Sequence, residues 1–581
     1  MDPLHGYPRP QLERDAWTSL DGAWQFAFDS AARWRGPDDV VWDREIRVPF
    51  APETPASGIA DTGFHPVCWY RRTFDAPAAA PGERVVLHFG AVDDDAEVWV
   101  NGRAVARHEG GYTPFSAGIT QHLRADGVQT VAVRAADDPH DLAKPRGKQD
   151  WQLAPHAIWY PRTSGIWQTV WIERLPAAAV SSLRWTPDVA RWAIAFDARV
   201  DGAPRDGLRL RVELRARDRL LADDTYAVLD GAVSRRIALP DPGIGDARAA
   251  LLWSPSSPAL IDARITLLDA AGSALDRVRS YTAMRSATIE GGAFLLNGRP
   301  YRPRMVLDQG YWPESGLTAP SDAALRRDVE LAKAMGFNGV RKHQKIEDPR
   351  YLAWADRLGL LVWEEMPSAY RFTPHAVARV TREWLAAVER DYSHPCIVAW
   401  VPFNESWGVS DMTSDAAQRD AVRALYRLTK SLDPTRPVID NDGWDHVVSD
   451  IITVHDYETD PDVLARRYAG PDGPPDVGPH GHRLALDGFR PDGLPVMLTE
   501  FGGIAWSNDP DGTWGYARVR SSEELAARYE RLLRAVHAVP SFAGFCYTQF
   551  ADTYQEANGL LFADRTPKFP LDQMKAITRG R

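Results

Sequence analysis

Short runs of alternating hydrophobic and polar residues, separated by turn residues, fill the first part of the chain. Trp24–Phe28, Val85–Phe89 and Ala96–Val100 follow this pattern, and Asn101-Gly102 after the last run is a strong hairpin signal. A period of two residues is typical of strands that bury one face. We therefore expect residues 1–177 to form an all-β jelly roll.

A second block of alternation follows the first. Leu208–Leu214 and Ala263–Leu268 place an apolar residue at every other position, as strands of a sandwich do. The block has the length of about 100 residues that is usual for an immunoglobulin-like domain. We expect this immunoglobulin-like β-sandwich to span residues 178–284.

After Ser286 the period changes, and apolar strands alternate with helical segments, which is the signature of parallel βα units. Eight units in about 300 residues are what a (β/α)8 or TIM barrel requires, so we expect a barrel over residues 285–581. Ser321, Asp348 and Ser521 are the predicted N-caps of three of its helices. The predicted strands lie near residues 301–307, 338–342, 360–365, 397–403, 437–441, 451–455, 495–499 and 542–547.

The net charge and the cysteine content limit the classes of partner and of site that we expect. The formal net charge of -11 at pH 7 provides no basic surface for a nucleic acid or an anionic membrane, and favours a neutral substrate. Cys68, Cys396 and Cys546 are odd in number and lack metal-ligand spacing, so we expect buried thiols. No signal-peptide pattern begins the chain, which predicts a cytoplasmic protein. A removed signal peptide would leave the same sequence, so a periplasmic or secreted location stays open.

Two glutamates directly follow predicted barrel strands. The fourth strand delivers Asn404-Glu405, and the seventh delivers Glu500. Because residues at the carboxyl ends of barrel strands line one cavity, we expect the two carboxyl groups to meet there. Cleavage of a glycosidic bond needs such a pair, with one carboxyl protonated and the other ionised. A solvated loop position is the competing interpretation for each glutamate alone.

Several dispersed motifs occur in the same order as in one known family. They are Trp17–Trp24, Cys68–Arg72 and Thr163–Trp171 in the jelly roll, and Gly336–Arg341, Gly359–Glu365, Asn404-Glu405 and Glu500 in the barrel. With the order of the three domains, they make the chain resemble glycoside hydrolase family 2, the group of β-galactosidases, β-glucuronidases and β-mannosidases. The resemblance extends over essentially the whole chain. It implies that the jelly roll corresponds to the family's sugar-binding domain.

The resemblance also implies roles for individual residues. Glu405 is expected to be the acid/base, and Glu500 the nucleophile that forms a covalent glycosyl-enzyme. Asn404 is expected to bind the sugar 2-hydroxyl. Arg341 should hold Glu500 ionised, and Tyr457 should place its phenol on Glu500.

Some positions depart from the family pattern. Tyr547 stands at the end of the eighth strand, where a tryptophan platform is common. Gln344 occupies the position of a histidine that often follows Arg341, and His343 is the candidate to replace that histidine.

Four further residues are weaker candidates for sugar binding. His455 and Asp308 lie at strand ends, where a structural hydrogen bond is an equally good interpretation. Trp407 and Trp506 follow the two glutamates closely enough to be platform residues, but simple packing within a loop explains them equally well.

The substrate prediction depends on the loop after the eighth strand. Family β-glucuronidases carry an Asn-x-Lys-Gly motif there, whereas this chain has Glu556–Gly559. Loss of the lysine, together with the added carboxylate of Glu556, would repel a uronic acid, which disfavours a glucuronidase.

We therefore predict a retaining exo-glycosidase that removes terminal neutral β-glycosides, with a β-galactoside as the first candidate. Other family specificities stay open: β-glucosidase, β-mannosidase, arabinosidase, galactofuranosidase and, least favoured, β-glucuronidase. A non-catalytic carbohydrate-binding protein and a transglycosylase are the alternatives from other classes. Two carboxylates complete the reaction, so no cofactor is expected, and no convincing metal-ligand cluster is seen. The expected partner is a small carbohydrate, and homo-oligomerisation is consistent with the resemblance.

Overall fold

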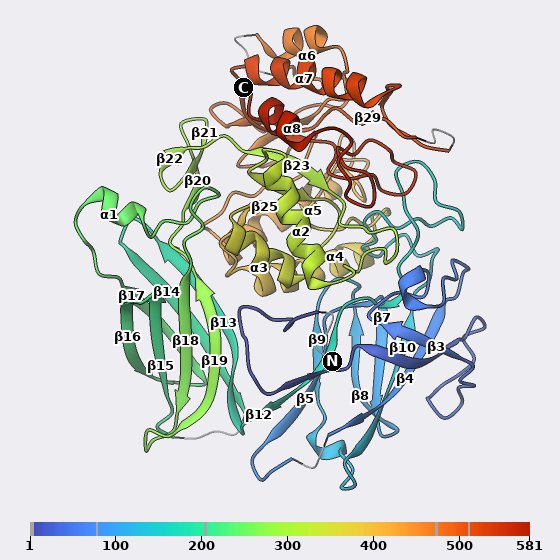
Figure 1. The fold of residues 1–581 in the computed structure, drawn as a ribbon, viewed down its shortest axis with the longest axis vertical. Helices are drawn as coiled ribbons and strands as arrows, with labels where there is room; N and C mark the ends of the chain where they lie inside the picture. The colour runs from blue at the N-terminus through green and yellow to red at the C-terminus, as the bar shows by residue number, and fades with distance from the viewer. Residues whose placement is uncertain (1–4, 77–78, 203–205, 471–473, 509–511, 581) are drawn as a thin grey trace.

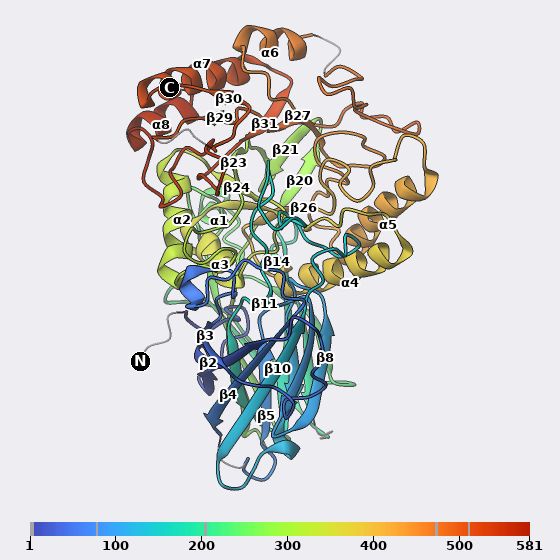
Figure 2. The same cartoon turned by 90° about the vertical axis from the view of Figure 1, so that its right-hand side faces the viewer.

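The computed structural model describes residues 5–76, 79–202, 206–470, 474–508 and 512–580. Two β-sandwiches lie side by side, and an α/β barrel packs against one end of both (Figure 1). In the side view the first sandwich stands below the barrel strands (Figure 2). No helix among these residues is long and apolar enough to cross a membrane.

The first sandwich has the predicted all-β architecture. One sheet has the order β1-β12-β5-β9 and the other the order β3-β2-β4-β10-β7-β8. Trp24 and Phe26 on β2 pack between the sheets with Leu87 on β5, whereas Gln25 between them is exposed. The strands are β1 (Trp17–Ser19), β2 (Gly22–Phe28), β3 (Arg44–Val48), β4 (Val67–Asp75), β5 (Arg84–Phe89), β6 (Val92–Asp93), β7 (Asp95–Val100), β8 (Arg103–Glu109), β9 (Phe115–Gly118), β10 (Val128–Ala136), β11 (Gly165–Ile166) and β12 (Val170–Leu175).

The second sandwich pairs β13-β14-β17 with β16-β15-β18-β19. Leu210, Val212 and Leu214 of β15 are buried in its core, which is the period of two that the sequence shows. Its elements are β13 (Ala178–Asp188), β14 (Ala193–Gly202), β15 (Arg209–Ala216), β16 (Arg219–Ala227), β17 (Ala232–Ala238), α1 (Gly245–Ala249), β18 (Ile261–Leu268) and β19 (Ala274–Thr282).

The barrel follows a small sheet made of β20 (Ala287–Glu290), β21 (Ala293–Leu296) and β22 (Arg299–Pro300). Its parallel strands have the order β26-β25-β24-β23-β31-β28-β27. They are β23 (Arg304–Asp308), β24 (Gly339–Lys342), β25 (Leu361–Glu365), β26 (Ile397–Val401), β27 (Ile452–His455), β28 (Val496–Glu500) and β31 (Phe542–Tyr547). The helices around them are α2 (Asp322–Ala334), α3 (Pro349–Leu358), α4 (Pro374–Asp391), α5 (Ala416–Leu432), α6 (Pro461–Tyr468), α7 (Ser522–Ala538) and α8 (Leu571–Thr578).

Three helices of the barrel begin where the sequence predicts. The side chains of Ser321, Asp348 and Ser521 each accept a backbone N–H from the first turn of α2, α3 and α7, respectively.

The fifth predicted strand is not a regular strand. Residues 437–442 make only single parallel bridges to the preceding strand segment, between Trp400 and Val438 and between Asn404 and Asp442. The Val438 N–H donates to the Asp450 carboxylate at 2.9 Å, so a side chain takes a bond that a neighbouring strand would accept. The segment still brings its last residue, Asp442, to the barrel mouth.

Candidate active site

The two glutamates meet across the barrel mouth. Glu405 lies in the loop after β26, and Glu500 is the last residue of β28. One oxygen of each carboxyl group and one ring nitrogen of His455 lie within 4.8 Å of one another. In retaining glycosidases the two carboxyl groups are about 5–5.5 Å apart, whereas inverting enzymes leave about 6.5–9.5 Å for a water molecule. The spacing therefore suits direct attack by one carboxylate.

Glu500 is held as an ionised group. It is 5% exposed, and its carboxylate accepts an N–H from Arg341 at 2.8 Å and the O–H of Tyr457 at 2.5 Å. Burial alone would raise the pKa of Glu500, but the positive charges of His455 and Arg341 outweigh it and lower the pKa to about 2. An ionised, immobile carboxylate is what a nucleophile at neutral pH requires.

Arg341 connects several strand ends. Its guanidinium is fully buried, and Nε lies 2.7 Å from Glu365 and 2.8 Å from Asp442. One terminal nitrogen donates to Glu500, and the other donates to the Asn404 side-chain oxygen at 2.6 Å. Such charge-assisted bonds fix the side chains in one geometry. Arg341 thus aligns Glu500 and Asn404.

The amide nitrogen of Asn404 is a free donor beside Glu500. Asn404 is 0% exposed, and within the described residues its Nδ2 has no hydrogen-bond partner. Since a buried donor without a partner is costly, a ligand hydroxyl at this place would remove that cost. The contact of Asn404 with the sugar 2-hydroxyl, which the resemblance implies, stays a prediction.

Glu405 has a different setting. Its side chain is 18% exposed, and both Glu405 and Ser406 have left-handed backbone conformations, with φ of 50° and 57°. The Glu405 N–H donates to the Asp442 carbonyl at 2.9 Å, and the Ser406 N–H donates to the Asn441 side chain at 2.9 Å. These bonds hold a backbone shape that non-glycine residues rarely adopt. They aim the carboxyl group at the cavity.

His455 lies between the two glutamates. Its Nδ1 is 2.7 Å from Glu405, and its Nε2 is 3.7 Å from both Glu500 and Asp442. Burial lowers the pKa of His455, but Glu500, Asp442 and Glu405 together raise it to about 10. The ring is therefore positively charged at neutral pH and lies against the Glu405 carboxyl group.

Tyr547 does not occupy the sugar platform that we expected. It is 0% exposed, and its ring packs edge-on against Tyr529 of α7 at 4.9 Å and against Phe501 at 5.4 Å. Successive residues of a strand point to opposite sides, and Tyr547 points to the helical layer. The next residue, Thr548, instead places its hydroxyl 3.2 Å from the Tyr457 hydroxyl.

Asp308 is also turned away from the catalytic pair. Its carboxylate pairs with Lys342 at 2.7 Å and accepts the Gly310 N–H at 2.9 Å. Lys342 in turn lies 4.3 Å from the ring centre of Tyr351 on α3. Lys342 follows the inward-facing Arg341 on β24 and so points outward. Asp308 therefore belongs to a buried ion-pair network, which was the structural alternative.

His343 reaches the site. Its Nδ1 is 3.1 Å from Glu365 and 3.3 Å from Arg341. Burial and the positive charge of Arg341 lower the pKa of His343 well below its usual value, so the ring is neutral. Gln344, by contrast, is held by two hydrogen bonds to Ser368.

The two candidate platform tryptophans differ. Trp407 packs near Trp159 at 5.9 Å and Tyr370 at 5.7 Å, within an aromatic group over the barrel mouth. Trp506 instead packs against Phe562 at 5.4 Å, and its backbone oxygen accepts a bond from Lys568. These contacts favour loop packing for Trp506.

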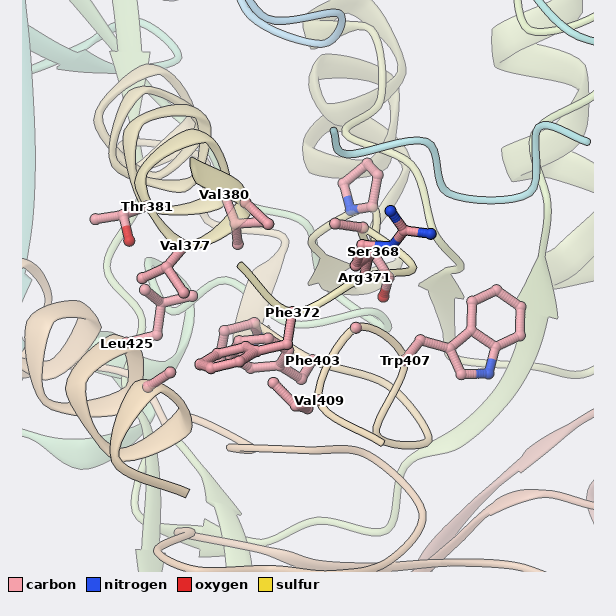
Figure 3. Close-up of a pocket in the computed structure, with 16 residues that line it drawn as sticks. Ser368, Arg371, Phe372, Val377, Val380, Thr381, Phe403, Trp407, Val409 and Leu425 are labelled. Carbon is pink, nitrogen blue, oxygen red and sulfur yellow. The ribbon is translucent and has the colours of Figure 1, made fainter. Parts of the chain in front are cut away.

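A separate apolar pocket lies beside Trp407. Figure 3 shows the indole of Trp407 at its edge, turned away from Phe372 and Phe403 in its middle. The pocket is lined by residues of α4, α5 and the loops after β25 and β26, and neither catalytic glutamate is among them. The loop that carries Trp407 forms part of the lining of this pocket.

Asp442 is a site residue that we did not predict. Its carboxylate pairs with Arg341 and accepts the Thr499 hydroxyl at 2.7 Å. Although burial opposes it, Arg341 and His455 hold the pKa of Asp442 well below its usual range. The sequence carried a usable signal, because Asp442 directly follows the fifth predicted strand, as Glu500 lies at the end of the seventh.

A segment of the first sandwich, residues 137–164, also contributes. It rises from that sandwich along the right-hand side of the barrel in Figure 1 and lies in front of the barrel strands in Figure 2. Lys148 lies 5.4 Å from the ring centre of Trp407, and the Tyr160 hydroxyl donates to the Glu556 carboxylate. Nothing in the alternating pattern signals where such a long loop goes. We therefore did not predict that this loop reaches the barrel.

Within the part of the chain that the structure describes, two groups of side chains have the spacing of metal ligands. In one of them, the His455 ring lies 2.7 Å from Glu405 and 3.7 Å from Glu500, as an ion-paired imidazole would. In the other, Asp356 already accepts bonds from Tyr281, from His394 and from the backbone of Cys396. Hydrogen bonds account for both groups.

The comparisons agree with this geometry. The sequence profile described as "Glycosyl hydrolases family 2, sugar binding domain" matches residues 17–172, and that described as "Glycosyl hydrolases family 2, TIM barrel domain" matches residues 288–468. A β-galactosidase of Thermoanaerobacter pseudethanolicus is 25% identical over 68% of this chain and 51% of its own length. A putative β-glucuronidase of Formosa agariphila is 26% identical over 63% of this chain and 44% of its length.

The chain spans about half the length of these curated relatives. Among solved structures, a Bifidobacterium dentium β-glucuronidase complexed with coumarin-3-O-glucuronide superimposes with a TM-score of 0.79. It is 21% identical, and the match covers 99% of this chain and 98% of that one. The likeness concerns the fold. With both family domains matched in order over more than half of its residues, the chain belongs to family 2 of the glycosyl hydrolases.

Proposed function

We propose that the chain is a retaining exo-β-glycosidase. The observation that carries the proposal is the approach of the Glu405 and Glu500 oxygens to within 4.8 Å at the mouth of one barrel. Glu500 attacks the anomeric carbon while Glu405 gives its proton to the leaving oxygen. Water then hydrolyses the glycosyl-enzyme after Glu405 removes its proton. The loop of the first sandwich over the barrel favours a terminal sugar over an internal one.

The identity of the sugar is a finer proposal. A neutral β-galactoside was the first candidate because Glu556 was expected to repel a uronic acid. Glu556 is buried, its carboxylate accepts the Tyr160 O–H, and burial raises its pKa. The repulsion is therefore weaker than that of a free carboxylate, and the cationic Lys148 favours an anionic sugar over a neutral one.

A panel of nitrophenyl α- and β-glycosides tests the proposal, with the first-formed product followed by NMR. Release of the β-anomer from a β-glycoside is expected, because two displacements at the anomeric carbon restore its configuration. Release of the α-anomer first would overturn the double displacement. Sugar binding without turnover of any glycoside would favour the carbohydrate-binding alternative.

A further inference from the structure

Lys148 is a buried cation that the proposed catalytic machinery does not use. It is 4% exposed, and among the residues that the structure describes its ammonium has no hydrogen bond or ion pair. Its neighbours are two aromatic rings, Tyr160 at 5.5 Å and Trp407 at 5.4 Å from their centres. A buried charge without a partner is unfavourable, and a ligand of opposite charge would remove this cost.

The backbone around Lys148 is fixed to the barrel. The N–H groups of Arg146 and Gly147 donate to the Ser368 carbonyl at 2.9 and 3.2 Å, and Tyr370 donates its hydroxyl to the Gly147 carbonyl. Gly147 has a φ of 59° and lies against the Gln344 carbonyl, where a side chain would not fit. The lysine is thus held in place by the ends of β24 and β25.

Its ammonium lies close to residues around the two glutamates. Burial is the main reason why the pKa of His343 is lowered and the pKa of Glu556 is raised, and the charges of Lys148 and Glu500 both act on each of these groups. Trp407, which lies under the ammonium, is two residues beyond Glu405. Lys148 therefore faces the space where the terminal sugar would sit.

The other cations of the site already have anionic partners. Arg341 is shared by three carboxylates, and His455 contacts Glu405. Lys148 lies near Glu556 without forming an ion pair, while Glu556 is bound to a tyrosine hydroxyl. A neutral sugar would leave the ammonium without a counter-charge, whereas a sugar carboxylate would supply one.

We propose that Lys148, supplied by the first sandwich, binds the carboxylate of a terminal uronic acid and selects an anionic sugar. This inference rests on the proposed glycosidase function and names its substrate class. The test uses nitrophenyl β-glucuronide and β-galacturonide beside the matched β-glucoside and β-galactoside. Wild type, Lys148→Met and the charge-conserving Lys148→Arg are compared, with thermal melting to establish that each variant folds.

We expect wild type to prefer the uronides. Lys148→Met should lower kcat/KM for them by about 100-fold, the loss typical of a buried charge pair that is broken, and should affect the neutral partners at least ten times less. Lys148→Arg should recover most of the loss. An equal loss on uronides and neutral glycosides would overturn the role of Lys148.

Calorimetry with free glucuronate, galacturonate, glucose and galactose separates this inference from the proposed function. If no glycoside is turned over, the proposed function fails, and tighter binding of the uronates to wild type than to Lys148→Met still supports the inference. If glycosides are turned over and the uronates bind equally to both proteins, the inference alone fails.

Discussion

The ends of β28 and β26 deliver one glutamate each into the same space, but they surround the two side chains differently. Glu500 is almost fully buried and bound by Arg341 and Tyr457. Glu405 is partly exposed, stands on a left-handed backbone and has His455 as its partner. A fixed ionised group suits attack on carbon, and an accessible one suits proton exchange with a leaving group and water. The difference in surroundings supports the proposed roles of nucleophile for Glu500 and acid/base for Glu405.

Removal of Glu500 should have the largest effect. Glu500→Gln keeps the shape but removes the attacking charge, and we expect kcat to fall on the order of 10⁴-fold or more for every substrate. Steady-state kinetics on the best nitrophenyl glycoside measures this. Glu523→Gln, an exposed change on α7, is the control. Activity within tenfold of wild type would mean that another group attacks the sugar.

Removal of Glu405 should depend on the leaving group. Glu405→Ala should lose about 10²–10⁴-fold on alkyl glycosides, which need protonation, and much less on dinitrophenyl glycosides. Azide should restore turnover of the latter and yield the β-glycosyl azide, because it attacks the covalent intermediate from the side that the carboxyl has left. Equal losses on both substrate types would contradict the assignment.

Tyr457→Phe tests how Glu500 is held. Loss of one hydrogen bond to a charged group costs about 1.5–3 kcal/mol, so we expect a decrease in kcat of about tenfold or more. The pKa of Glu500 should rise, which moves the acidic limb of the pH–rate profile upward. Tyr547→Phe is the matched control, since that ring faces α7, and it should stay within twofold. A larger loss of kcat in Tyr547→Phe than in Tyr457→Phe would show that Tyr547 acts in the active site after all.

His455 should make the stability of the folded protein decrease at alkaline pH. Its pKa of about 10 in the folded protein lies above the usual 6.5, so its contribution is complete below pH 6.5 and is lost as the pH rises to 10. We expect the melting temperature to fall by a few degrees over that window. In His455→Gln the fall should be shallower; a parallel fall in both proteins would point to other groups.

The sequence predicted residues that depend on barrel topology. Glu405 and Glu500 were found because strand ends converge, and Arg341 and Tyr457 followed from the resemblance. The errors came from the side to which a strand residue points. Asp308 and Tyr547 end their strands correctly but face the helical layer, where an ion pair and aromatic packing bury them.

Two features lay beyond the local pattern. The path of residues 137–164 depends on contacts with Ser368 and Gln344, roughly 200 positions away, so periodicity carried no signal for Lys148. The fifth predicted strand does not form a regular strand, because the Asp450 carboxylate accepts a backbone N–H from it. Asp442, the polar residue at the end of this segment, could have been predicted in the same way as Glu500, from its place at the end of a barrel strand.

The anchoring of Gly147 on the Ser368 carbonyl has an evolutionary consequence. The proposed reaction chemistry depends on residues of the barrel, whereas the segment that carries Lys148 belongs to the earlier sandwich domain. Mutations in the early segment can retune what the enzyme accepts without disturbing bond cleavage. Expression of the barrel by itself would leave the proposed substrate site open on one side.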